Sequence, residues 1–88
     1  MKTHEILQAE LNEASLKIKV GAIYAHFKNQ DKYMVIKLAF LEETEELCVV
    51  YQSVDNPALV FVQPLARWLT QKDLNGTLVD RFTKLKDL

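Results

Sequence analysis

Apolar residues recur at helical spacing near the start of the chain. They follow one another at intervals of four, three and four residues: Leu7, Leu11, Ala14 and Ile18. Thr3 is a suitable N-cap, and Glu5 suits the positive end of a helix dipole. The pattern predicts a helix from Thr3 to Ser15. A helix this short and thinly apolar is marginal alone, so its stripe must pack on its own domain or on a second copy of the chain.

The period changes to two after this segment, which is typical of β-strands. Alternating apolar and basic residues predict a strand over residues 16–20, which continues over residues 22–28 after a bend at Gly21. The stretch "YAHFK" then places Tyr24, His26 and Lys28 on one face. We expect this polar row to be either a binding site or the solvated side of a sheet.

Further strands and a helical turn are expected in the rest of the chain. "KYMVIKLAFLE" predicts a long strand whose even positions, from Met34 to Phe40, face the core. "EETEE" predicts a hairpin turn, and strands are expected at "LCVVYQSV", "LVFVQ" and "LVDRF". Pro64 can begin a helical turn through "LARWL", with Trp68 in the core. "KDLNGT" is expected to be a loop with an Asn-Gly turn, and "TKLKDL" a weakly docked tail.

Five short antiparallel strands with a helical turn before the last close most simply into a small barrel. We therefore expect a mainly β fold, a five-stranded SH3-like barrel with an N-terminal α-helix. The 88 residues have room for one core. We expect a single domain over residues 1–88, with a helical extension at 1–16 and the barrel at 17–84.

Charge and composition narrow the classes of partner. The formal net charge of −1 gives no bulk electrostatic case for nucleic acid or an anionic membrane. The charged N-terminal segment does not resemble a signal peptide, and no apolar stretch approaches the roughly 20 residues of a membrane span. The single cysteine, Cys48, lies in an apolar run where a buried thiol is expected, and it fits a reducing compartment. We expect a cytoplasmic protein with no membrane partner.

An ordered set of residues follows the pattern of a known family. The matching residues are Gly21, Ile23, Tyr24, His26, Phe27, Lys28, Tyr33, Val35, Ala39, Glu43, Thr44, Glu46, Val49, Val50, Tyr51, Phe61, Val62, Pro64, Leu65, Trp68, Arg81 and Phe82. Over about residues 20–83 the chain resembles the small bacterial family known as domain of unknown function 1653. The resemblance implies no particular activity.

Three positions depart from the pattern of that family. Asn29 stands where the family has a glycine, and Gln63 where it usually has an arginine. Phe61 matches the family's aromatic position but replaces its usual tryptophan. The Gln63 difference removes a cation from any anion-binding site at this position.

Polar side chains from several predicted strands could converge on one side of such a barrel. The candidate ligand-binding residues are Tyr24, His26, Lys28, Glu43, Thr44, Tyr51 and Arg81. Cationic donors, a carboxylate acceptor and a titratable imidazole suit a small polar or anionic ligand.

The alternative for these residues is structural. His26 would be hydrogen-bonded to Glu43 or Thr44, Lys28 would form a surface pair with Glu43, Arg81 would pair with an acid of the "EETEE" turn, and Tyr51 would be a cross-strand partner of Tyr24.

We expect a non-enzymatic binding module that recognises a small polar or anionic ligand or a protein segment. One alternative is a small barrel that binds single-stranded nucleic acid by stacking bases on exposed aromatics beside cations such as Lys28 and Lys37. A second is a small enzyme that uses His26 with Glu43 as an acid/base pair. The chain has no nucleophile elbow, glycine-rich phosphate loop or metal-ligand spacing, so we expect no metal and no cofactor. A homodimer through the Leu7/Leu11 stripe is a separate hypothesis.

Overall fold

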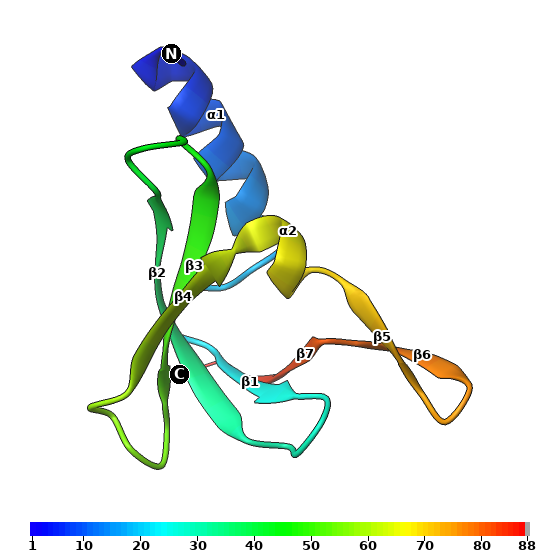
Figure 1. Cartoon of the computed structure of the whole chain (residues 1–88). Coiled ribbons are helices and arrows are strands. Elements are labelled where there is room, and N and C mark those ends of the chain that lie inside the picture. The colour runs from blue at the N-terminus through cyan, green and yellow to red at the C-terminus, as the bar shows by residue number, and fades with distance from the viewer. Residues whose placement is uncertain (88) are drawn as a thin grey trace.

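The computed structural model describes residues 1–87 and contains two antiparallel β-sheets and an N-terminal helix (Figure 1). The strands are β1 Ile23–His26, β2 Lys32–Phe40, β3 Leu47–Ser53, β4 Val60–Pro64, β5 Gln71–Leu74, β6 Thr77–Asp80 and β7 Phe82–Lys86. Five of them form one sheet in the order β4-β3-β2-β1-β7, and β5 pairs with β6. The predicted mainly β class with an N-terminal helix is confirmed. The large sheet is not closed, because β4 and β7 lie at its two edges.

The N-terminal helix α1, His4–Ser15, forms where the sequence predicts it. The Thr3 hydroxyl caps it by accepting a hydrogen bond from the Ile6 N–H at 3.2 Å. Its apolar stripe packs on its own domain, since Ala14 is buried and Leu11 contacts the core. None of the helices formed by residues 1–87 is long and apolar enough to cross a membrane.

The predicted strand over residues 16–20 is wrong, because these residues form turns. The Ile18 side chain is only 2 % exposed, whereas Leu16 is 87 % exposed, so the apolar residues do not share one buried face. The Lys19 N–H donates to the Tyr24 hydroxyl at 3.0 Å, and Gly21 has a φ of 91°, which favours glycine. The alternation of basic and apolar residues here comes from a tight connection that buries Ile18 alone.

A β-bulge in β2 changes which side chains face the core. Val35 pairs with Tyr51 but Lys37 pairs with Val50, so one extra residue is inserted at Ile36. As a result Val35, an odd position, is fully buried, and Leu38, an even position, is buried as well. The prediction that all even positions face the core is therefore correct only beyond the bulge.

The chain after α2, Leu65–Trp68, holds more strand than the sequence predicts. The expected loop at residues 72–77 is part of a hairpin that projects away from the large sheet (Figure 1). Its turn is Asn75-Gly76, with φ of 55° and 84°. The predicted strand over 78–82 is split at Arg81, and most of the expected tail forms the edge strand β7.

The core lies against one side of the large sheet, which we call the inner face. Its members come from α1, the turn before β1, every strand of the large sheet except β4, and α2: Ala14, Ile18, Ala22, Tyr24, Val35, Leu38, Val49, Trp68 and Phe82. Trp68 is only 3 % exposed, which confirms its prediction as a core residue. Helix α2 therefore covers the inner face at the point where β4 ends.

Candidate functional site

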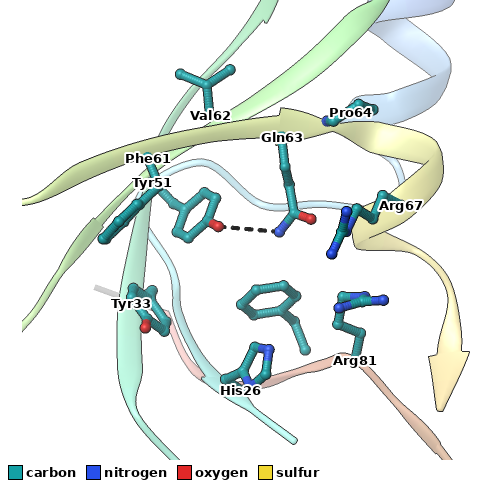
Figure 2. Close-up of a pocket in the computed structure, with 10 residues that line it drawn as sticks. His26, Tyr33, Tyr51, Phe61, Val62, Gln63, Pro64, Arg67 and Arg81 are labelled. Carbon is teal, nitrogen blue, oxygen red and sulfur yellow. Dashed lines mark hydrogen bonds between the residues drawn. The ribbon is translucent and has the colours of Figure 1, made fainter.

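A pocket of about 420 Å³ opens on the inner face between β4, α2 and the start of β7 (Figure 2). It is lined by one residue of each of β1, β2 and β3, by β4, and by residues around α2 and β7: His26, Tyr33, Tyr51, Phe61, Val62, Gln63, Pro64, Arg67, Arg81 and Phe82. The lining contains two arginines and no carboxylate. Its electrostatic potential therefore favours an anion.

Aromatic rings form one wall of the pocket. The Tyr51 and Phe61 rings lie 5.6 Å apart, tilted by 31°. The Tyr33 ring is nearly perpendicular to both, at 86° and 85°. Phe82, which also lines the pocket, contacts Tyr33 and Tyr51 at 6.1 and 5.7 Å between ring centroids. It stacks on Trp68 with ring centroids 3.7 Å apart and planes 3° from parallel.

Strand register explains why these rings meet. Tyr51 lies directly opposite Phe61 in the β3–β4 pair and opposite Val35 in the β2–β3 pair. Side chains directly opposite one another share a face. Tyr33 is two residues from Val35, on the same side of the bulge, and therefore joins them on the inner face.

Two arginines supply positive charge to the pocket. The Arg81 Nε donates to the Thr70 hydroxyl at 3.0 Å, and that hydroxyl donates to the Arg67 carbonyl at 2.7 Å. Among residues 1–87 the Arg67 guanidinium makes no hydrogen bond, and all four ion pairs use lysines. Figure 2 shows both guanidinium groups on the same side of the pocket, next to Gln63. Their terminal nitrogens are available to a ligand.

His26 is placed at the floor of the pocket by the end of β1. Its Nδ1 accepts the Lys28 N–H at 3.2 Å, which assigns the neutral tautomer with the proton on Nε2. Burial lowers the pKa of His26 below its usual value of 6.5, and the nearby Arg81 charge lowers it further, with Asp31 opposing. An anion in the pocket would counter the Arg81 effect and favour the protonated ring.

The two tyrosines of the pocket stay protonated. Burial raises the pKa of Tyr33 and of Tyr51 above the usual value of 10.0. The Gln63 side chain donates from Nε2 to the Tyr51 hydroxyl at 3.2 Å, as the dashed line in Figure 2 shows. Each phenol therefore still has a proton to donate.

Three of the seven candidate residues meet in this pocket, namely His26, Tyr51 and Arg81. Tyr24 lies on the inner face with His26, but it is buried in the core against Trp68, at 5.4 Å between ring centroids. Lys28 lies in the exposed turn after β1, not on the strand. The row in "YAHFK" is thus neither one site nor a solvated face.

Glu43 and Thr44 lie far from the other candidates. They are in the turn after β2, where the Thr44 hydroxyl accepts the Glu46 N–H at 3.2 Å. Tyr33, which lines the pocket, is seven residues from Phe40 at the end of β2, or about 23 Å at 3.3 Å per residue. The structure therefore does not bring His26 and Glu43 together as an acid/base pair. The expected ion pairs of Glu43 with Lys28 and of Arg81 with this turn are also not formed among the described residues.

Sequence reasoning missed seven of the ten residues that line the pocket. Arg67, Gln63, Phe61, Tyr33 and Phe82 were not among the candidate ligand-binding residues. The alternation of Phe61 and Gln63 along β4 was a usable signal, since the two share a face. The position of Arg67 depends on α2 folding back over the sheet, which no local pattern indicates.

Charge is segregated along the molecule. The segments 1–15 and 41–46 hold seven of the twelve acidic residues but a single basic one, Lys2. The Lys2 N–H donates to the Glu45 carboxylate at 2.9 Å, which joins the two segments at one end of the molecule (Figure 1). The remaining chain has ten basic residues against five acidic ones. Although the net charge of the chain is −1, the residues outside these two segments together carry a net positive charge.

Comparison with known proteins gives two matches. The family model described as "Protein of unknown function (DUF1653)" matches residues 22–84. The structure is similar to a crystal structure of a DUF1653 protein from Bordetella bronchiseptica, with a TM-score of 0.68 and 27 % identity, covering 77 % of this chain and 88 % of that chain. No curated protein matches the chain. All residues that line the pocket fall within the matched range, and α1 falls outside it.

Proposed function

The chain belongs to the DUF1653 family, whose function is unknown, and we propose that it is a binding module that holds a small anionic ligand in the pocket between β4, α2 and β7. The observation that carries this proposal is the pair of arginines, Arg67 and Arg81, in a lining that has no carboxylate.

Neither Arg67 nor Arg81 forms an ion pair among residues 1–87, so both guanidinium groups can accept a ligand anion as their counter-charge. Arg81 is held by Thr70 through Nε only, so its two terminal nitrogens form a fork for an oxyanion. Arg67 adds a second fork. Charge-assisted hydrogen bonds of this kind contribute about 1.5–3 kcal/mol each.

Binding without chemical conversion is the role that the lining groups support. The titratable groups beside the arginines in the lining are one imidazole and two phenols, and the Asp31 carboxylate, which acts on the pKa of His26, lies outside the lining. His26 would add a third donor through Nε2, and its charge would respond to the ligand.

We also propose a cytoplasmic location. The single cysteine, Cys48, is unpaired, as is usual for proteins of a reducing compartment.

The test is a titration of the labelled protein with sodium sulfate and then inorganic phosphate, followed by amide NMR at constant ionic strength. We expect shifts centred on the pocket. Arg67→Gln and Arg81→Gln should each weaken binding about tenfold or more, because each removes a charge-assisted contact. Gln63→Arg should strengthen it several-fold, because it adds a third guanidinium to the lining.

The matched control is Lys37→Gln, which removes one positive charge from an exposed position of β2 outside the pocket. It should bind as the wild type does. The proposal fails if either arginine variant binds sulfate as well as the wild type, or if Lys37→Gln weakens binding equally.

A further inference from the structure

The aromatic wall indicates what the uncharged part of the ligand is. Resting on the anion binding proposed above, we infer that the ligand is a flat aromatic ring joined to a phosphate group, the chemistry of a nucleoside monophosphate.

The pocket has two chemically different sides. Figure 2 shows Arg67 and Arg81 together on one side, Tyr33, Tyr51 and Phe61 on the other, and Gln63 between them. A ligand that fills this space is therefore anionic at one end and apolar at the other.

The aromatic side forms a corner that fits a flat ring. The Tyr51 and Phe61 planes are within 31° of each other, and the Tyr33 plane is close to perpendicular to both. A ligand ring stacked on Phe61 would meet Tyr33 edge-on. Aromatic pairs favour both the stacked and the edge-on arrangement. The Phe61 side chain is 40 % exposed, so its surface is accessible to such a ring.

Neutral polar groups stand beside this corner. Gln63 uses one N–H for the Tyr51 hydroxyl, which leaves its carbonyl oxygen and second N–H free. The Tyr33 hydroxyl has no hydrogen-bond partner among residues 1–87. These donors and acceptors match a heteroaromatic ring, whose edge carries nitrogen and oxygen atoms, better than a plain hydrocarbon ring.

The size of the pocket also exceeds what an inorganic anion needs. A water molecule occupies about 30 Å³ in the liquid, and a phosphate ion only a few times that. The pocket of about 420 Å³ is within the range that holds organic ligands. Phosphate alone would leave the aromatic side unfilled.

The experiment compares inorganic phosphate, ribose 5-phosphate, adenosine and adenosine 5′-monophosphate by calorimetry or NMR at constant ionic strength. We expect adenosine 5′-monophosphate to bind at least tenfold more tightly than ribose 5-phosphate. Phe61→Ala should weaken adenosine 5′-monophosphate about five- to tenfold and leave ribose 5-phosphate unchanged, because base stacking is lost. The matched control is Val60→Ala, which truncates an exposed neighbour on β4 outside the pocket and should change neither.

The outcomes separate the two proposals. If ribose 5-phosphate and adenosine 5′-monophosphate bind equally, the aromatic inference is overturned and anion binding stands. If no phosphate compound binds, anion binding fails and the inference fails with it.

A single-stranded hexanucleotide distinguishes a free nucleotide from a nucleotide within a strand. Affinity equal to that of the monophosphate supports a one-nucleotide site. Affinity that rises steeply with strand length and falls with salt overturns the small-ligand inference and indicates nucleic-acid binding.

Discussion

The two ends of the molecule differ in both charge and packing. At one end, α1 and the turn between β2 and β3 carry seven acidic residues and are linked by exposed contacts, such as the ion pair of Lys2 with Glu10 at 2.7 Å. At the other, rings from β1, β2, β3, β4, α2 and β7 each lie within 6.1 Å of at least one other ring, beside two arginines. The contacts between the acidic segments are exposed and charged, whereas the region around the pocket is packed by aromatic rings.

This difference shows what net charge omits. A value of −1 argues against an anionic partner only if the charges are evenly mixed. Here α1 and one turn hold most of the acid, and β2 separates that turn from the pocket by about 23 Å. That is more than two Debye lengths at physiological salt, so the four acidic residues of that turn barely oppose anion binding.

Removing the Trp68 ring should cause the largest loss of stability. Trp68→Ala deletes the ring that stacks on Phe82 and contacts Tyr24 and Tyr51. We expect the free energy of unfolding to fall by about 3–5 kcal/mol, as for other buried tryptophans. Urea denaturation measures this loss. If Trp68→Ala does not fold, Trp68→Phe provides a measurable intermediate value.

We expect this loss of stability only for substitutions in the aromatic region, and not for substitutions at the acidic end. A loss below about 1 kcal/mol for Trp68→Ala would contradict the description of the stack as the main support of the pocket.

Acidification should destabilise the region around His26, with an effect smaller than that of Trp68→Ala. The pKa of His26 in the folded protein is lowered, so the unfolded chain binds its proton more readily. The corresponding stability is fully present above about pH 6.5 and is lost as the pH falls through the lowered folded-state pKa. Urea denaturation at pH 7.5 and pH 5.5 should show this loss in the wild type, and His26→Asn should reduce it. His4→Gln removes the histidine at the acidic end and should retain it.

Anion binding should raise the pKa of His26, which burial and Arg81 lower in the free protein. Sulfate in the pocket stabilises the imidazolium, so it should raise the pKa of His26, and sulfate should bind more tightly as the pH falls. Ring-proton NMR with and without sulfate follows this change. An unchanged His26 pKa at saturating sulfate would place the anion elsewhere.

The smallest effect is expected at the acidic end. Lys2→Met removes the pair with Glu10, whose side chains are 43 % and 32 % exposed. Exposed pairs contribute less than about 1 kcal/mol, so the urea midpoint should change little and phosphate affinity should not change. A loss approaching that of Trp68→Ala would show that the two ends are not held by different kinds of contact.

Local pattern predicted the parts of this fold that local forces decide. The cap at Thr3, the turns after β1 and β2, strands β2 to β4 and the helical turn after Pro64 all follow from nearby residues. The alternation of apolar residues gave a wrong prediction where one extra residue in a strand reverses which side chains face the core. The bulge at Ile36 exchanges the two faces of β2, and only pairing with β3 fixes its position.

The candidate site was predicted in part for the same reason. His26, Tyr51 and Arg81 were identified as polar residues on or beside strands, but their convergence with Arg67 depends on α2 and on the split at Arg81. Glu43 and Thr44 were placed wrongly because the number of residues in β2 determines how far that turn lies from the pocket.

The stack of Trp68 on Phe82 also makes the protein its own optical probe. Trp68 is the single tryptophan of the chain, and the ring it stacks on lines the pocket. Two of the three tyrosines, Tyr24 and Tyr51, have ring centroids within 5.4 Å of it and would transfer excitation to it. Intrinsic fluorescence therefore reports on this one region without a label, and the acidic end is invisible to it.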